Sequence, residues 1–177
     1  MASYSYLYLY CSWFIIFAIY AMTSPQTVVA QNHLINNICH RTNFVDFCRH
    51  ALMSDPASAH PDLNLHSLGV IANRLAARNM TSISAQIRHL INNERDAERI
   101  QNLRVCGRFY DAADSDVRSM STYWEGREVS EARVRAIAAL HFVGLCRAEL
   151  LGHEGYPVNN VIMQRLLFIV ITIYDAA

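Results

Sequence analysis

Cysteine is the residue type whose spacing in this chain most clearly predicts chemistry. The sequence has five cysteines, of which Cys11 lies in an uncharged amino-terminal stretch and four lie further along, at positions 39, 48, 106 and 146. Four cysteines in an oxidising compartment are typical of a disulfide framework, whereas four free buried thiols fit a reducing compartment. We therefore expect two disulfides in the mature chain.

Residues 1–30 indicate that the chain enters such a compartment. They carry no charged side chain, an apolar run extends from Leu7 to Ala21, and Val28 and Ala30 are placed for cleavage before Gln31. This pattern is typical of a cleaved signal peptide, with an uncleaved amino-terminal anchor as the alternative. We expect a secreted protein without membrane contact after cleavage, glycosylated at Asn79 of the Asn-Met-Thr sequon.

Local signatures of catalysis or of metal binding are missing from the sequence. It contains no G-x-S-x-G elbow, no phosphate-binding glycine loop and no H-E-x-x-H pair. The neighbours Cys39-His40 and Cys48-Arg49-His50 suggest zinc, but zinc would compete with the disulfides and the spacing matches no common zinc site. We expect no catalytic residue, no metal and no cofactor, so the chain is not expected to be an enzyme.

The charges balance over the whole chain but not locally. Fifteen basic residues, all of them arginine, face fifteen acidic ones, so no net field attracts nucleic acid. Seven arginines cluster at positions 74, 78, 88, 95, 99, 104 and 108. Only Glu94, Asp96 and Glu98 oppose them in that stretch. This cluster is either a binding patch for an acidic surface or a solvated outer face.

Four helices are predicted to position the cysteines, because apolar residues recur every three or four positions in four stretches. These stretches are Asp62 to about Ile91, residues 97–120, a helix capped by Ser130 and ending near Leu150, and Asn159 to about Tyr174. Cys106 and Cys146 fall on the apolar stripes of the second and third helices. The expected fold is all-α: a four-helix up-down bundle over residues 62–177, preceded by an amino-terminal helical hairpin over residues 31–61.

Consecutive helices joined by a short turn pack antiparallel, which brings their facing stripes together. We therefore pair Cys106 with Cys146. The remaining pair, Cys39 with Cys48, would close the hairpin.

The cysteines and their flanking residues follow a recognisable order. The first block is Ile35, Cys39, Thr42, Cys48 and Leu52, and the second is Ser54-Asp55-Pro56 with Ser58, Asp62, Leu63 and Leu65. Later come Cys106 with Tyr110 and Ala113, and then Ala138-Ala139-Leu140 before Cys146. In this order and spacing, residues 31–177 resemble the plant invertase and pectin methylesterase inhibitor family.

The resemblance implies a function without catalysis. It implies the same bundle and the same disulfides, and an inhibitor that binds one cell-wall enzyme molecule and blocks its carbohydrate-binding cleft. Pectin methylesterase is the leading target and cell-wall or vacuolar invertase the alternative. From another class, a non-inhibitory helical bundle that binds cell-wall polysaccharide remains open. The expected location is the apoplast or cell wall, with the vacuole as the alternative.

The candidate contacts to the target are four residues of the middle helices: Arg108, Tyr110, Asp114 and Glu128. Three positions depart from the pattern of pectin methylesterase inhibitors. Arg108 stands where those proteins usually have an acidic residue, Ile137 replaces a serine, and Leu145 replaces a threonine.

Overall fold

The computed structural model describes residues 33–151 and 158–177; the expected signal peptide, residues 1–30, lies outside them. Every regular element in the described part is helical. Residues 33–39 form a short helix, followed by α3 (Val45–Met53), a 3-10 turn η1 (Pro56–Ala59), α4 (Leu65–Asn93), α5 (Ala97–Glu125), α6 (Val129–Glu149) and α7 (Asn160–Tyr174). The expectation of an all-α fold is confirmed.

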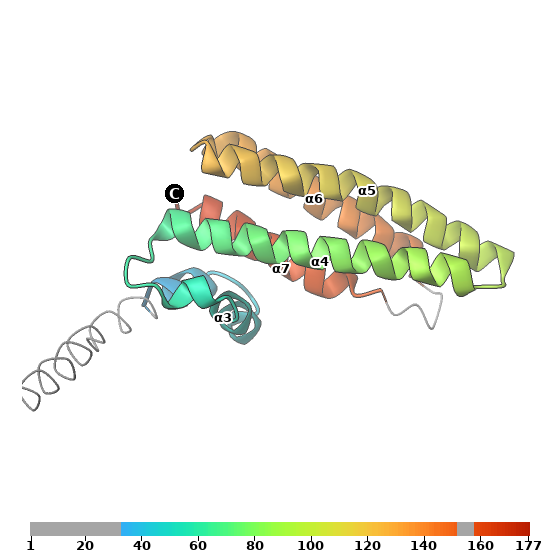
Figure 1. Ribbon diagram of the computed structural model, residues 1–177, viewed down its shortest axis with the longest axis horizontal. Helices are drawn as coiled ribbons and strands as arrows, with labels where there is room; N and C mark the ends of the chain where they lie inside the picture. The colour runs from blue at the N-terminus through green and yellow to red at the C-terminus, as the bar shows by residue number, and fades with distance from the viewer. Residues whose placement is uncertain (1–32, 152–157) are drawn as a thin grey trace, which may run out of the picture.

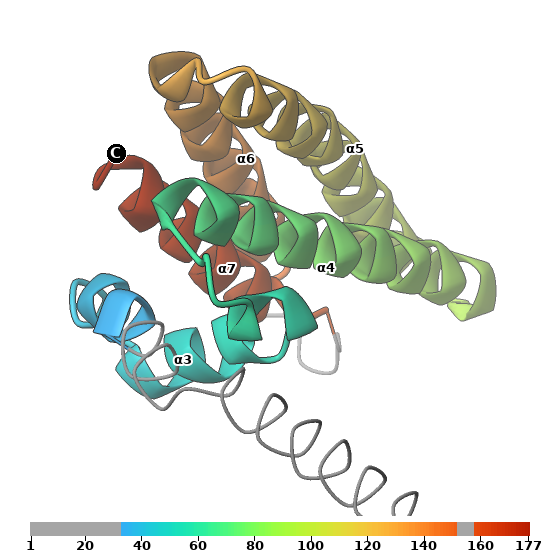
Figure 2. The ribbon, with the colours of Figure 1, turned by 60° about the vertical axis from the view of Figure 1, so that its left-hand side comes forward.

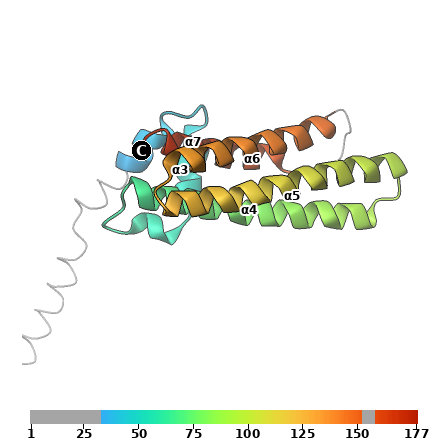
Figure 3. The same ribbon diagram turned by 90° about the horizontal axis from the view of Figure 1, so that it is seen from above.

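The four long helices α4 to α7 run alternately in opposite directions and form the bundle (Figure 1). Helix α5 packs against α4 and α6, and α7 packs against α6 and α4, which closes the ring. Seen from above, α4 and α5 lie side by side along most of their length (Figure 3). The inward stripes of the four long helices supply the core. It includes Leu68 and Ile83 on α4, Val143 on α6 and Leu167 on α7.

Side-chain caps fix where α4 and α5 begin. Asn64 accepts a hydrogen bond from the backbone N–H of Ser67 at 3.0 Å, and the Ser67 hydroxyl accepts one from the backbone N–H of Asn64 at 2.9 Å. This capping box satisfies two amide donors that the first turn leaves free. Asp96 caps α5 by accepting from the backbone N–H of Arg99 at 2.8 Å. Helix α4 therefore begins three residues after the expected Asp62.

The turn between α5 and α6 corrects the expected cap at Ser130. Helix α6 already begins at Val129, and no side chain caps it. Arg127 has a φ of 64°. Its backbone N–H bonds to the Trp124 carbonyl at 3.1 Å, and that of Glu128 bonds to the Tyr123 carbonyl at 2.8 Å. These two bonds form a Schellman motif, so the end of α5 rather than a serine cap sets the start of α6.

Trp124 holds three helices together at one end of the bundle. Its ring is 2% exposed, stacks on Tyr174 of α7 with centroids 4.5 Å apart, and stacks on His66 of α4 at 5.3 Å. The indole Nε1 donates to the His66 backbone carbonyl at 2.9 Å. Gly69 permits this approach, because a Cβ built at position 69 would lie only 2.3 to 2.4 Å from atoms of the indole ring.

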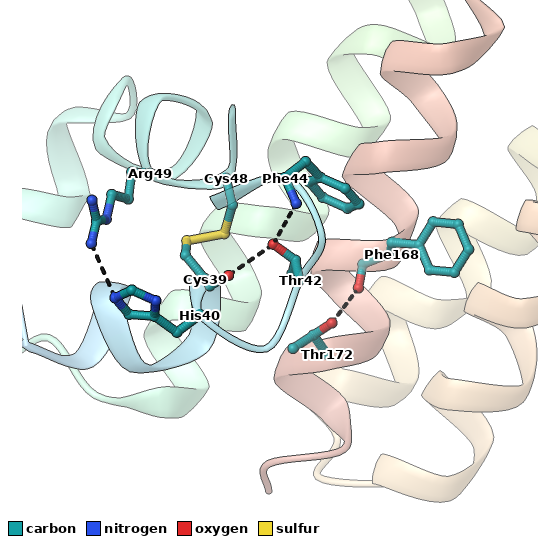
Figure 4. Close-up of a disulfide and its surroundings, with 8 residues drawn as sticks. All are labelled: Cys39, His40, Thr42, Phe44, Cys48, Arg49, Phe168 and Thr172. Carbon is teal, nitrogen blue, oxygen red and sulfur yellow. Dashed lines mark hydrogen bonds between the residues drawn. A yellow bond between two sulfur atoms is a disulfide. The ribbon is translucent and has the colours of Figure 1, made fainter. Parts of the chain in front are cut away.

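The amino-terminal hairpin consists of residues 33–39 and α3, and the Cys39–Cys48 disulfide joins its two arms with Cα atoms 5.5 Å apart (Figure 4). Inside the connecting loop, the Thr42 hydroxyl donates to the Cys39 carbonyl at 2.8 Å and accepts from the backbone N–H of Phe44 at 3.4 Å. The hairpin packs beside α7 and the start of α4 (Figure 2). Phe44 lies 6.4 Å from the Phe168 ring of α7, centroid to centroid.

The second disulfide joins Cys106 of α5 to Cys146 of α6, with Cα atoms 4.4 Å apart. Small side chains make this close approach possible, since Ala132, Ala136 and Ala139 form the inward face of α6 and are fully buried. Both disulfides have the pairing that we expected from the sequence.

Candidate target-binding surface

The four residues predicted to contact the target do not form one site. Arg108 is exposed near the middle of α5, whereas Glu128 is exposed in the turn after α5 ends. The helix rises by about 25 Å from Arg108 to Glu125, at 1.5 Å per residue. A partner that touches both residues must therefore cover most of the length of the bundle.

The prediction that Tyr110 contacts a partner is wrong, because its side chain is 0% exposed. Its hydroxyl donates to the Oδ1 atom of Asn160 on α7 at 2.7 Å, and burial raises the pKa of this phenol above its ordinary value. Tyr110 joins α5 to α7 inside the bundle. The sequence held the indication, since Tyr110 lies one turn after Cys106 on the same inward stripe.

Asp114 remains accessible, but it is partly neutralised. Its side chain is 26% exposed and forms an ion pair with Arg118 one turn later on α5. The neighbouring Asp116 bonds to Arg135 of α6, with 3.2 Å between Oδ1 and Nη1. Only the Asp116–Arg135 pair crosses between the helices, and it joins α5 to α6 beside their buried contact.

An exposed, largely apolar stripe on α6 lies outside the set of residues predicted to contact the target. Val134 is 63% exposed and Ile137 is 40% exposed. His141 and Leu145 continue the same side of the helix at three- and four-residue spacing, and we call these four residues the α6 outer face. Apolar residues lying outside the inward stripe of Ala132, Ala136 and Ala139 were the available indication. Exposed apolar side chains gathered on one face are typical of a protein-binding surface.

The arginine cluster divides into two groups in the structure. Arg74 is held by the buried carboxylate of Asp55 at 2.9 Å, and Arg99 by Glu94 at 3.4 Å. Backbone N–H groups of Asp96 and Arg95 bond to Glu94 and keep the pKa of its carboxyl below the ordinary value. The remaining arginines of α4 and α5 are exposed, and three of them line a groove between these helices: Arg88, Arg104 and Arg108.

Asn79 of the sequon is half-buried in α4, and its amide nitrogen donates to the Leu75 carbonyl at 3.1 Å, so glycosylation there stays a prediction. Within residues 33–151 and 158–177, no three His, Cys, Asp or Glu side chains gather into a metal site. No helix in the same part is both long and apolar enough to cross a membrane.

Comparison with known proteins identifies the family. The sequence profile described as "Plant invertase/pectin methylesterase inhibitor" matches residues 33–169, which include both disulfides and the α6 outer face. The chain belongs to this family. A "Pectinesterase inhibitor" from Actinidia deliciosa is 27% identical over 145 residues, which cover 82% of this chain and 77% of that protein. Since these relatives are inhibitors rather than catalysts, they support the expectation that the chain is not an enzyme.

Solved structures of the family have the same fold. A mutant form of a pectin methylesterase inhibitor from Arabidopsis superposes with a TM-score of 0.72 at 20% identity, covering 80% of this chain and 95% of that one. A second inhibitor, from Arabidopsis thaliana, gives 0.63 at 18% identity, covering 81% and 95%. The expected four-helix bundle with an amino-terminal hairpin is confirmed.

Proposed function

We propose that this protein inhibits a pectin methylesterase by forming a 1:1 complex over the active-site cleft of the enzyme. The observation that carries the proposal is the family match over residues 33–169 together with the pectinesterase inhibitor relative. The geometry suits this role. Helices already ordered by a disulfide and a packed core lose little conformational entropy when they dock on a partner.

The α6 outer face is the proposed anchor of the complex. Ile137 and Val134 are apolar side chains that the fold leaves in water, and docking would remove them from it. Asp114 and Glu128, both accessible, would form part of the polar rim. Inhibition would then depend on contact area along α6 and on charge at its borders, without any reacting group.

The direct test is a titration of the oxidised, mature protein into a plant pectin methylesterase acting on esterified pectin. We expect methanol release to fall in proportion to added protein and to stop near equimolar amounts, with the complex seen by light scattering as one copy of each protein. An unchanged rate at micromolar inhibitor would refute the proposal.

A matched pair of variants tests the anchor. Ile137 on α6 and Val161 on α7 are both 40% exposed, so Ile137→Glu and Val161→Glu place the same charge at equally exposed apolar sites. We expect I137E to weaken inhibition by about tenfold or more, because it desolvates a carboxylate in the interface, and V161E to remain close to the unmodified protein. Equal weakening by both would place the anchor elsewhere.

Invertase is the second candidate target, and one observation favours it. Arg108 is exposed where pectin methylesterase inhibitors usually carry an acidic residue, so the charge that this site presents to a partner is reversed. The same titration against a cell-wall or vacuolar invertase separates the two targets.

The cellular location follows from the proposed target. We propose that residues 1–30 are removed as a signal peptide and that the mature protein is secreted to the apoplast. Mass spectrometry of protein purified from the cell wall would give an amino terminus at Gln31 and would also report a glycan on Asn79. A chain that starts at Met1 would contradict cleavage.

A further inference from the structure

The groove between α4 and α5 is a second surface with its own chemistry. It has a volume of about 390 Å³, at the lower end of the range for small-ligand sites. Three guanidinium groups line it, Arg88 from α4 and Arg104 and Arg108 from α5, and we call it the basic groove. Asp111 is the acidic residue in the lining, so its charged groups sum to two positive charges.

The three arginines form no ion pair with any described carboxylate. Arg104 and Arg108 lie one turn apart on the same side of α5, where like charges repel each other. Other arginines of the same cluster are neutralised, as Arg74 is by Asp55. The basic groove therefore keeps positive charge that an anionic ligand would neutralise.

The rest of the lining defines the ligand further. The partly exposed side chain of Ile91 contributes apolar surface to the groove, and Gly107 has no side chain to fill the space. A small inorganic anion would leave this apolar part unused. A sugar ring that carries a carboxylate offers an apolar C–H face to it and a charge to the guanidinium groups, which bind carboxylates in bidentate fashion.

We infer that the basic groove binds de-esterified pectin, a polyuronate chain with one carboxylate on each sugar. The inference rests on the proposed function, because hydrolysis of methyl esters by the target enzyme releases methanol and leaves such carboxylates. Repeated carboxylates along one chain match two arginines on successive turns of α5 and a third across the groove on α4. Binding would hold the inhibitor on wall segments where the enzyme has already acted.

The test is calorimetric titration of the oxidised mature protein with a short oligogalacturonate, without enzyme, at low salt and mildly acidic pH. The fully methyl-esterified oligomer of the same length is the ligand control. We expect the acidic oligomer to bind, the esterified one to bind at least about tenfold more weakly, and added salt to weaken binding of the acidic oligomer. Equal binding of the two oligomers, or no binding of either, overturns the inference.

A charge-matched pair of variants locates the site. R88Q/R104Q removes two positive charges inside the basic groove, and R78Q/R95Q removes two from exposed arginines of the same cluster outside it. We expect the first variant to lose about tenfold or more in affinity and the second to stay within about twofold, with unchanged circular dichroism for both. Equal losses would mean diffuse attraction to the whole cluster and would overturn the groove as the site.

The inhibition assay distinguishes this inference from the proposed function. If the protein inhibits pectin methylesterase but does not bind the oligogalacturonate, the inference fails while the proposed function stands. If the oligomer does not bind and R88Q/R104Q abolishes inhibition, the groove receives an acidic surface of the enzyme, which also overturns the inference. If the oligomer binds by the groove and no enzyme is inhibited, the proposed function fails and the protein binds polysaccharide alone.

Discussion

Replacing Gly69 by alanine tests the packing that joins the ends of α4, α5 and α7. The new Cβ would lie 2.3 to 2.4 Å from atoms Cε2, Cζ2 and Nε1 of Trp124, far inside van der Waals contact. The ring cannot move freely, because it is 2% exposed and stacked on Tyr174 at 4.5 Å. It would have to shift away from α4, which also lengthens the 2.9 Å bond from Nε1 to the His66 carbonyl.

The magnitude follows from three contributions. Overpacking a filled core costs about 1–3 kcal/mol. Weakening the indole hydrogen bond costs about 1 kcal/mol. Alanine in a helix interior gains about 1 kcal/mol over glycine, which offsets part of this. We expect G69A to lower the free energy of unfolding by about 1–3 kcal/mol, or the melting temperature by about 3–10 °C.

The assay is thermal and urea unfolding of the oxidised protein, with Gly144→Ala as the matched control. Gly144 also lies inside a helix, but a Cβ there would meet Gln164 Nε2 at an ordinary 3.6 Å. G144A should therefore raise stability by up to about 1 kcal/mol. Both variants make the same chemical change, but the surroundings differ, so the changes in the free energy of unfolding should have opposite signs. Stabilisation by both would refute the close contact between Gly69 and Trp124.

Four further predictions concern the disulfide, the buried tyrosines and the α5–α6 turn. Replacing Cys106 and Cys146 by alanine opens a loop of 40 residues and should lower the free energy of unfolding by about 4 kcal/mol, measured by urea unfolding. Tyr110→Phe should cost about 1–2 kcal/mol and leave the inhibition constant unchanged, whereas a changed constant with unchanged stability would restore a contact role. Burial raises the pKa of the Tyr110 and Tyr174 phenols above the ordinary 10.0, so the unfolded chain loses the phenol protons at lower pH than the folded protein does. The free energy of unfolding should therefore fall as pH rises above 10. In the double phenylalanine variant this fall should disappear. Arg127→Gly should raise the melting temperature, because glycine adopts the φ of 64° without steric cost, and a lower value would contradict the observed turn.

Spacing in the sequence predicted the bundle well because each long helix buries one continuous stripe. The stripe around Cys106 and the stripe around Cys146 meet in the structure, and the disulfide follows from that meeting. Helix starts were less predictable, since they depend on hydrogen bonds of a few residues. Asn64 and Ser67 start α4 by a capping box, and the turn at Arg127 starts α6 before Ser130.

The binding surface could be predicted only in part, for a physical reason. An inward stripe is a property of one helix, whereas exposure depends on what the neighbouring helices cover. The prediction that Tyr110 contacts a partner fails because its stripe is buried, and the predicted contacts do not include Val134 although its side chain is exposed. Whether an arginine is neutralised also depends on neighbouring elements. Arg74 and Arg88 belong to one cluster in the sequence, yet Arg74 pairs with Asp55 whereas Arg88 pairs with no described carboxylate.

The disulfide-linked helices α5 and α6 would allow the protein to hold two ligands at once. Helix α5 contributes Arg104 and Arg108 to the basic groove that it forms with α4, and it is joined through Cys106 to α6, which carries Ile137 on its outer face. The two surfaces share no residue, so binding at one need not displace a ligand from the other. Because the disulfide holds α5 against α6, an inhibitor held on a polyuronate chain through the groove would keep its α6 outer face in a fixed position relative to the groove. The attachment would raise the local concentration of inhibitor where product accumulates, without any change in its affinity for the enzyme.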